Sequence, residues 1–277
     1  MDKDIQIGIM SGRLSPKTGN RIQAFPKTNW KNEFVLASDY GFKVIEWIFD
    51  EYENPILSNN EIQEMKFLSN KFNIQINSIC CDYFMNNLLF QESKIKQEKT
   101  VKTLEKIIKQ CHQLSIEILV IPLVDSSSLK SNLDEEQFLK NLEVVLPIAQ
   151  DNNVYLTLET DFPPEKFREL LLKIDHPNIK ANYDTGNSAS CGYNTKKELE
   201  MIESWIKNIH IKDRVFHGTT VLLGRGDVDF NSFFLTLRQI GYKGDLIIQG
   251  ARIEGEEPQM TCRKYMQFIK QYIDKYF

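Results

Sequence analysis

Strand-like and helix-like segments alternate along the whole chain, and this alternation restricts the possible folds more than any other feature. Eight short runs of apolar and β-branched residues are each followed by a segment whose apolar residues have helical spacing. Strands joined through helices pair in parallel, because a parallel pair needs a crossover connection of a dozen or more residues. Eight consecutive units predict that residues 1–277 form a single (β/α)8 TIM barrel.

The predicted elements leave one competing architecture, an open doubly wound sheet of six or seven units. We expect strands at 5–10, 44–48, 74–82, 116–124, 154–160, 179–187, 206–213 and 246–249, and helices at 32–40, 60–72, 94–113, 134–151, 164–174, 195–207, 231–240 and 256–277. No predicted strand is followed by GxGxxG or GxxxxGK[ST], so nucleotide-binding forms of the open sheet lose support. The closed barrel is therefore favoured.

Composition limits the partners and the compartment. Hydrophobic residues make up 42% of the 277 residues, which is enough for a large core. The net charge of −4, with both signs mixed, gives no basic stripe, so we expect no nucleic-acid partner. No run reaches 18 apolar residues, so we expect no membrane span. Five cysteines without a CxxC pair suit a reducing cytoplasm, and residues 1–4 do not resemble a signal peptide.

Three consecutive strand-like segments each end on a residue that can bind a metal: Glu159, Asp184 and His210. In a barrel the carboxyl ends of the strands converge on one mouth. Each residue alone has a simpler explanation, namely a structural ion pair for Glu159, a helix cap for Asp184 and a hydrogen-bonded core position for His210. Taken together, two carboxylates and an imidazole on neighbouring strands predict a site for a divalent cation.

Other polar residues are expected to surround this site and bind the substrate. These candidates are Arg13, Glu46, Asp82, Asn187, His217 and Arg252. The guanidinium groups of Arg13 and Arg252 match a phosphate or a carboxylate, although either could instead tie a loop to the barrel through a salt bridge. His217 lies in a loop and could contact the substrate or simply be exposed.

Several of these segments together resemble a known family over the full length of the chain. They are Glu159 on the fifth strand, Asp184-Thr-Gly-Asn, His210-Ile-Lys-Asp, Leu223-Gly-Arg-Gly-Asp-Val-Asp-Phe, Met10-Ser-Gly-Arg-Leu and Ile45-Glu-Trp. The pattern resembles the xylose-isomerase-like TIM barrels, which include sugar and sugar-phosphate isomerases and epimerases, inosose dehydratases and AP endonucleases. The resemblance implies a small sugar or sugar phosphate as substrate, and a homodimer or homotetramer.

The resemblance also implies a set of metal ligands. Ketose epimerases of that family hold a divalent ion with a Glu, an Asp, a His and a second Glu on the last strand. Carried over to this chain, these positions are Glu159, Asp184, His210 and Gln249. The expected cofactor is Mn, Mg, Zn or Co. Gln249 departs from the family pattern, because an amide oxygen can coordinate a cation but carries no charge and cannot act as a base. We therefore expect weaker metal retention.

The family chemistry passes through an enediolate, with Glu159 as metal ligand and proton shuttle. Epimerisation needs proton carriers on two faces of the carbon, whereas aldose–ketose isomerisation can use one base. Without a second Glu, this chain favours isomerisation unless Lys212, Glu46 or Asp82 supplies the second carrier. We take Lys212 as the second catalytic candidate.

Three alternatives to a sugar isomerase or epimerase differ in their chemistry. An inosose-type dehydratase would use the same enolate chemistry followed by loss of hydroxide. AP endonuclease activity is disfavoured, because those relatives hold several metals with many His ligands and this chain has four His in total. A barrel that binds a carbohydrate without turning it over stays open, because Gln249 replaces a catalytic acid.

Overall fold

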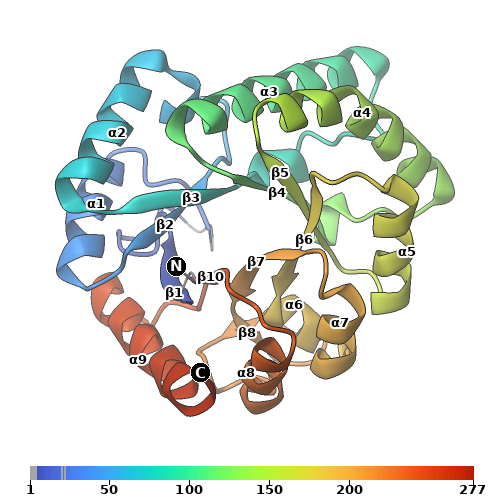
Figure 1. Ribbon diagram of the computed structural model, residues 1–277. Helices are drawn as coiled ribbons and strands as arrows, with labels where there is room; N and C mark the ends of the chain where they lie inside the picture. Colours follow the sequence, from blue (N-terminus) through green and yellow to red (C-terminus); the bar gives the residue numbers. More distant parts are fainter. Residues whose placement is uncertain (1–4, 20, 22) are drawn as a thin grey trace.

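The computed structural model describes residues 5–19, 21 and 23–277, so the expectation about residues 1–4 lies outside the described part of the chain. Eight parallel strands close into a barrel in the order β1-β10-β7-β6-β5-β4-β3-β2, and the helices surround it (Figure 1). The barrel strands are β1 (Gln6–Met10), β2 (Val44–Ile48), β3 (Gln75–Cys80), β4 (Ile118–Leu123), β5 (Tyr155–Thr160), β6 (Ile179–Asp184), β7 (Ile206–Ile211) and β10 (Asp245–Ile248). The predicted (β/α)8 barrel is confirmed.

The helices are α1 (Trp30–Asp39), α2 (Asn59–Phe72), α3 (Lys94–Leu114), α4 (Asn132–Asp151), α5 (Pro164–Ile174), α6 (Thr185–Cys191), α7 (Thr195–Ile202), α8 (Phe230–Gln239) and α9 (Pro258–Tyr276). Apart from α6, they overlap the segments where their spacing places them, although α7 ends five residues before the predicted end at 207. In α3 the apolar side chains of Val101, Leu104 and Ile108 form one buried face against the barrel. Ser131 begins α4 by accepting a hydrogen bond from the backbone N–H of Asp134. Within the described ranges, no helix has the length and apolar character that crossing a bilayer requires.

The region after β6 departs from the prediction. The expected strand 179–187 stops at Asp184, where the short helix α6 begins. The side chain of Asp184 accepts a hydrogen bond from the backbone N–H of Asn187 (2.8 Å) and so caps this helix. Helix α6 consists of small residues without an apolar stripe, so periodicity could not reveal it. The small antiparallel pair β8 (Asp213–Arg214) and β9 (Thr220–Val221) was also not predicted.

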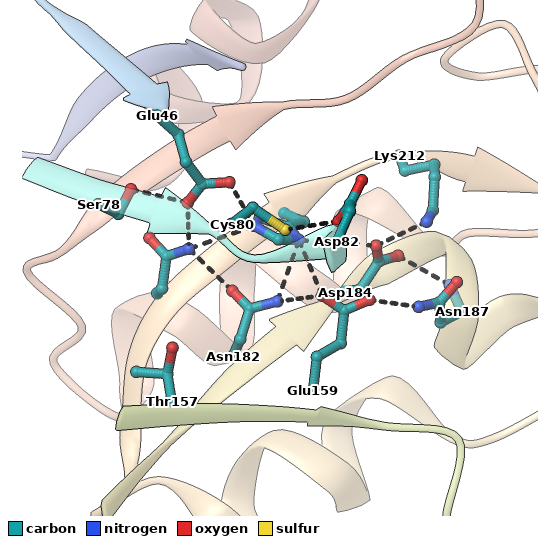
Figure 2. A network of polar contacts seen from close by, with 12 residues as sticks. Glu46, Ser78, Cys80, Asp82, Thr157, Glu159, Asn182, Asp184, Asn187 and Lys212 are labelled. Atoms are coloured by element: carbon teal, nitrogen blue, oxygen red, sulfur yellow. Dashed lines mark hydrogen bonds and ion pairs between the residues drawn. The ribbon is translucent and has the colours of Figure 1, made fainter. Parts of the chain in front are cut away.

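Strand register places the predicted site residues at one depth of the barrel. Asp184 on β6 lies opposite His210 on β7, and Asn182 lies opposite Asn208 one layer below. Residues between these positions face the surrounding helices, as Tyr183 does by stacking on a phenylalanine of α8. Alternate residues of the strands therefore build two polar layers inside the barrel, the upper one at the mouth (Figure 2).

Candidate active site

His210 lies at the centre of the site, and a carboxylate contacts each of its ring nitrogens. Its Nε2 is 2.7 Å from Oε1 of Glu46, and its Nδ1 is 3.0 Å from Oε2 of Glu159. The imidazole is fully buried. Burial by itself lowers the pKa of His210, but Glu46 and Glu159 outweigh it and raise that pKa to about 10. Without a cation, His210 is therefore an imidazolium held between two carboxylates.

Glu159 is fixed from below and from the side by two amides. Its Oε2 accepts a hydrogen bond from Asn182 Nδ2, and its Oε1 accepts one from Asn187 Nδ2, both at 2.7 Å (Figure 2). Asn187 is in turn held by Arg214, whose Nη1 donates to the amide oxygen at 3.0 Å. The carboxylate of Glu159 thus points in one direction, which a proton-transfer group requires.

Asp184 connects the site to Lys212. Its Oδ2 lies 2.8 Å from Lys212 Nζ and 3.9 Å from His210 Nδ1, while its Oδ1 caps α6. Burial lowers the pKa of Lys212, but the charges of Asp184 and Glu159 outweigh it, so the pKa is raised overall. Lys212 is therefore an ammonium group whose charge lies beside two carboxylates.

The donor set fits a divalent cation. One ligand atom from each of Glu159, Asp184 and His210 lies within 4.8 Å of the other two. Two ligands of one Zn²⁺ lie up to about 4.2 Å apart, so small side-chain movements would suffice to bind an ion. The ion would displace the proton on His210 Nδ1, while Glu46 would hold the proton on Nε2, an arrangement common at metal sites.

Of these groups, Glu159 lines a cavity of about 310 Å³ at the barrel mouth, whereas Asp184 and His210 lie outside its lining. Its lining includes Glu159, Asn187, Lys212, Gln249, Arg13 and Asp82. Gln249 directly follows β10, where its backbone N–H donates to Ile211 O at 2.9 Å. Burial raises the pKa of Asp82 to about 6, although hydrogen bonds from Cys80 and Gln23 partly oppose this. A larger cavity of about 580 Å³ lies at the opposite end, beside the first residues of β3, β4, β7 and β10.

The structure places three predicted substrate-binding residues outside this lining. Glu46 lies beneath His210, fully buried, and also accepts hydrogen bonds from Ser78 and Asn208. The guanidinium of Arg252 donates to the backbone oxygens of Gly12 and Ser15, so it ties the loop after β1 to the barrel. His217 is exposed in the loop between β8 and β9, with its ring against that of Phe216.

Several contributing residues were not predicted. Asn182, Asn208 and Ser78 form the lower polar layer, and Gln23 and Arg214 line the cavity. The sequence could have revealed this layer. Asn182 and Asn208 stand two residues before Asp184 and His210, so each lies on the same face of its strand as the site residue. Gln23 lies in a long loop, where no periodicity places a side chain.

The fold and this site define the class of protein. Residues 34–272 match the xylose isomerase-like TIM barrel family. The chain belongs to that family, as the resemblance implied.

Two similar relatives are named as sugar-phosphate epimerases. A putative L-ribulose-5-phosphate 3-epimerase of Haemophilus influenzae is 25% identical over 279 residues, covering 94% of this chain and 97% of the relative. The L-ribulose-5-phosphate 3-epimerase of Escherichia coli K12 is 24% identical over 254 residues, covering 87% and 89%. Epimerases are isomerases, so the predicted enzyme class is confirmed at the level of these relatives.

Solved structures share the fold. An L-ribulose 3-epimerase superposes with a TM-score of 0.81 at 16% identity, covering 98% of this chain and 95% of that one. A xylose isomerase domain protein from Planctomyces limnophilus gives 0.78 at 16% identity, with 99% of each chain covered. At this identity, the likeness supports the barrel and carries no residue roles.

Proposed function

We propose that this chain is a divalent-metal-dependent epimerase or isomerase of a sugar or sugar phosphate that acts through an enediolate. One observation carries the proposal: Glu159, Asp184 and His210 bring their ligand atoms within 4.8 Å of one another. Glu159 also lines the cavity at the barrel mouth, where barrel enzymes place their chemistry. The names of the relatives support a sugar epimerase.

Glu159, Asp184, His210 and the amide oxygen of Gln249 would hold the cation. Two carboxylates, a neutral imidazole and an amide would just balance its two charges. When bound, a divalent ion would act as a Lewis acid that makes the C–H bond beside the substrate carbonyl more acidic.

Glu159 is the proton carrier for this C–H bond. The amides of Asn182 and Asn187 hold its carboxylate in place, and the buried setting keeps competing water away. Holding a base in one orientation removes the entropy cost of finding it during the reaction.

Lys212 is the candidate for the second proton carrier. Its ammonium group lines the same cavity and contacts Asp184 at 2.8 Å. With Gln249 unable to exchange a proton, Lys212 can deliver one to the face that Glu159 does not reach. Epimerisation then needs Lys212, while a one-base isomerisation does not.

The test follows solvent deuterium into the substrate. The metal-loaded protein is incubated in D2O with pentuloses and their 5-phosphates, and exchange and products are read by NMR. We expect exchange that stops with Glu159→Gln and continues with Glu169→Gln, an exposed control on α5. Lys212→Met should retain exchange but lose the epimer. Aldose formation unaffected by Lys212→Met would instead establish one-base isomerisation.

A second candidate function is carbohydrate binding without turnover. Gln249 favours it, since this side chain replaces an acid at the position where the family carries a second Glu. Saturable sugar binding without deuterium exchange for any ligand would establish it, and a dehydrated product from an inosose would establish a lyase.

A further inference from the structure

Arg13 is a buried cation that forms no ion pair with any carboxylate in the described part of the chain. The residue is 5% exposed in the loop after β1, and it lines the candidate cavity. Its Nη1 donates to Gly250 O at 3.2 Å, and its Nη2 donates to Gln23 Oε1 at 3.1 Å. Its Nε has no hydrogen-bond partner. Among the described residues, no carboxylate oxygen lies within 4.0 Å of the guanidinium.

The surroundings leave this charge uncompensated. Burial and the neighbouring cation Arg252 together lower the pKa of Arg13 to about 10. The carboxylate that acts on this charge, Asp82, is bridged to Arg13 by Gln23, whose amide donates to Asp82 Oδ2 at 2.7 Å while its oxygen accepts from Arg13 Nη2. Burying a charge without a partner is strongly destabilising, because the lost hydration is not replaced. Such a group is retained where a ligand supplies the opposite charge.

Arg252 shows what a purely structural arginine looks like in the same region. Its Nη1 donates to Ser15 O at 2.8 Å and its Nη2 to Gly12 O at 2.5 Å, and Glu33 lies near enough to stabilise its charge. Arg252 does not line the candidate cavity. Arg13 differs in both respects, because it faces the cavity and lacks an acid.

We propose that Arg13 pairs with a phosphate group of the substrate, so that the site selects a sugar phosphate over the neutral sugar. This inference rests on the proposed function for the sugar part of the ligand. Arg13 and Glu159 line the same cavity of about 310 Å³, so one elongated ligand can reach both groups. The forked guanidinium matches phosphate oxygens with two parallel hydrogen bonds.

The first experiment measures phosphate binding by calorimetry on the full chain, without any turnover. Wild-type protein should bind inorganic phosphate saturably. Arg13→Gln should weaken this binding at least about 30-fold, because a buried charge pair is lost. Arg225→Gln, an exposed arginine in the turn before α8, should leave it unchanged. Equal phosphate binding by wild type and Arg13→Gln overturns the proposal, and so does tighter binding of malonate than of phosphate.

The second experiment compares ligands on wild-type protein, so it does not depend on a variant that folds. A pentulose 5-phosphate should bind at least about 30-fold more tightly than the same pentulose without phosphate. Arg13→Lys, which keeps the charge but loses the fork, should reduce that preference. Equal affinity for the two sugars overturns the proposal. Turnover of a neutral ketose with no preference for its phosphate would refute the role of Arg13 but leave the enzymatic function standing. Phosphate binding that depends on Arg13, without turnover of any sugar, would refute the enzymatic function but leave the role of Arg13 standing.

Discussion

Glu46 and Glu159 are two buried carboxylates that contact opposite nitrogens of the same imidazole. Glu46 meets His210 Nε2 at 2.7 Å and Glu159 meets Nδ1 at 3.0 Å. Glu46 is fully enclosed, and Ser78 and Asn208 donate to its other oxygen. Glu159 lines the cavity. Similar chemistry and burial therefore support different roles, because one carboxylate faces the barrel core and the other faces the mouth.

The difference teaches that depth along a strand decides what a polar residue can do. Glu46 is the third of the five residues of β2, whereas Glu159 is the fifth of the six residues of β5. A carboxylate in mid-strand can orient His210 but cannot reach a substrate. One near the strand end can contact both a cation and a ligand.

The largest expected effect concerns Glu159, the carboxylate that faces the barrel mouth. Glu159→Gln removes the proposed proton carrier while keeping the side-chain shape, so kcat should fall by about 10²- to 10⁴-fold. Steady-state turnover of a pentulose 5-phosphate by the metal-loaded protein measures this, with thermal unfolding as the check on folding. If kcat were retained, the carboxylate facing the cavity would not be the base.

A third buried carboxyl, Glu198, sharpens the comparison because no cation among the described residues affects its pKa. Burial raises the pKa of Glu198 from 4.5 to about 7, although hydrogen bonds from Ser188 and Tyr183 partly oppose this. The folded protein thus holds this proton more tightly than the unfolded chain does. The free energy of unfolding should therefore fall as the pH rises from about 4.5 to 7, by on the order of 3 kcal/mol.

Glu198→Gln should flatten this pH dependence, as measured by urea unfolding at a series of pH values. Part of the slope should remain, since burial also raises the pKa of Glu33 to about 7. Glu200→Gln, on the exposed side of the same helix, is the control and should leave the slope unchanged. An unchanged slope in Glu198→Gln would mean that this carboxyl is ionised in the folded protein.

Replacing Glu46, the carboxylate that faces the barrel core, should have a smaller effect. Glu46→Gln leaves His210 in place but removes the charge that holds its Nε2 proton, so Mn²⁺ affinity should fall about 10- to 100-fold. Calorimetric titration of metal-free protein measures this change. A loss of kcat at saturating metal as large as that of Glu159→Gln would contradict the separate roles of the two residues.

The sequence supported the upper layer of the site and much less of what surrounds it. Glu159, Asp184 and His210 could be predicted because each is the last or the second-last residue of a strand, and strand ends converge in a barrel. Glu46 was assigned to the same mouth, but its depth depends on pairing register, and β2 shifts register against β3 between Val44 and Glu46. A single sequence gives no register.

Loop residues escaped prediction for a different reason. Periodicity fixes the direction of a side chain on a helix or strand, but it says nothing about a segment that follows neither. Arg252 and His217 were therefore grouped with the substrate-binding residues, although one ties down a loop and the other is exposed. Gln23, which bridges Arg13 and Asp82, went unnoticed for the same reason.

The smallest expected effect concerns Gln249, where the resemblance implies a second Glu. Gln249→Glu adds a third carboxylate beside Glu159 in the cavity, and additional ligand charge strengthens the hold on a hard cation. We expect the Mn²⁺ dissociation constant to fall about tenfold, measured by the same titration. Glu254→Gln, on the exposed loop beyond β10, should leave it unchanged. Weaker binding in Glu254→Gln would instead make Glu254 the fourth ligand. No change in Gln249→Glu would place that side chain outside the coordination shell.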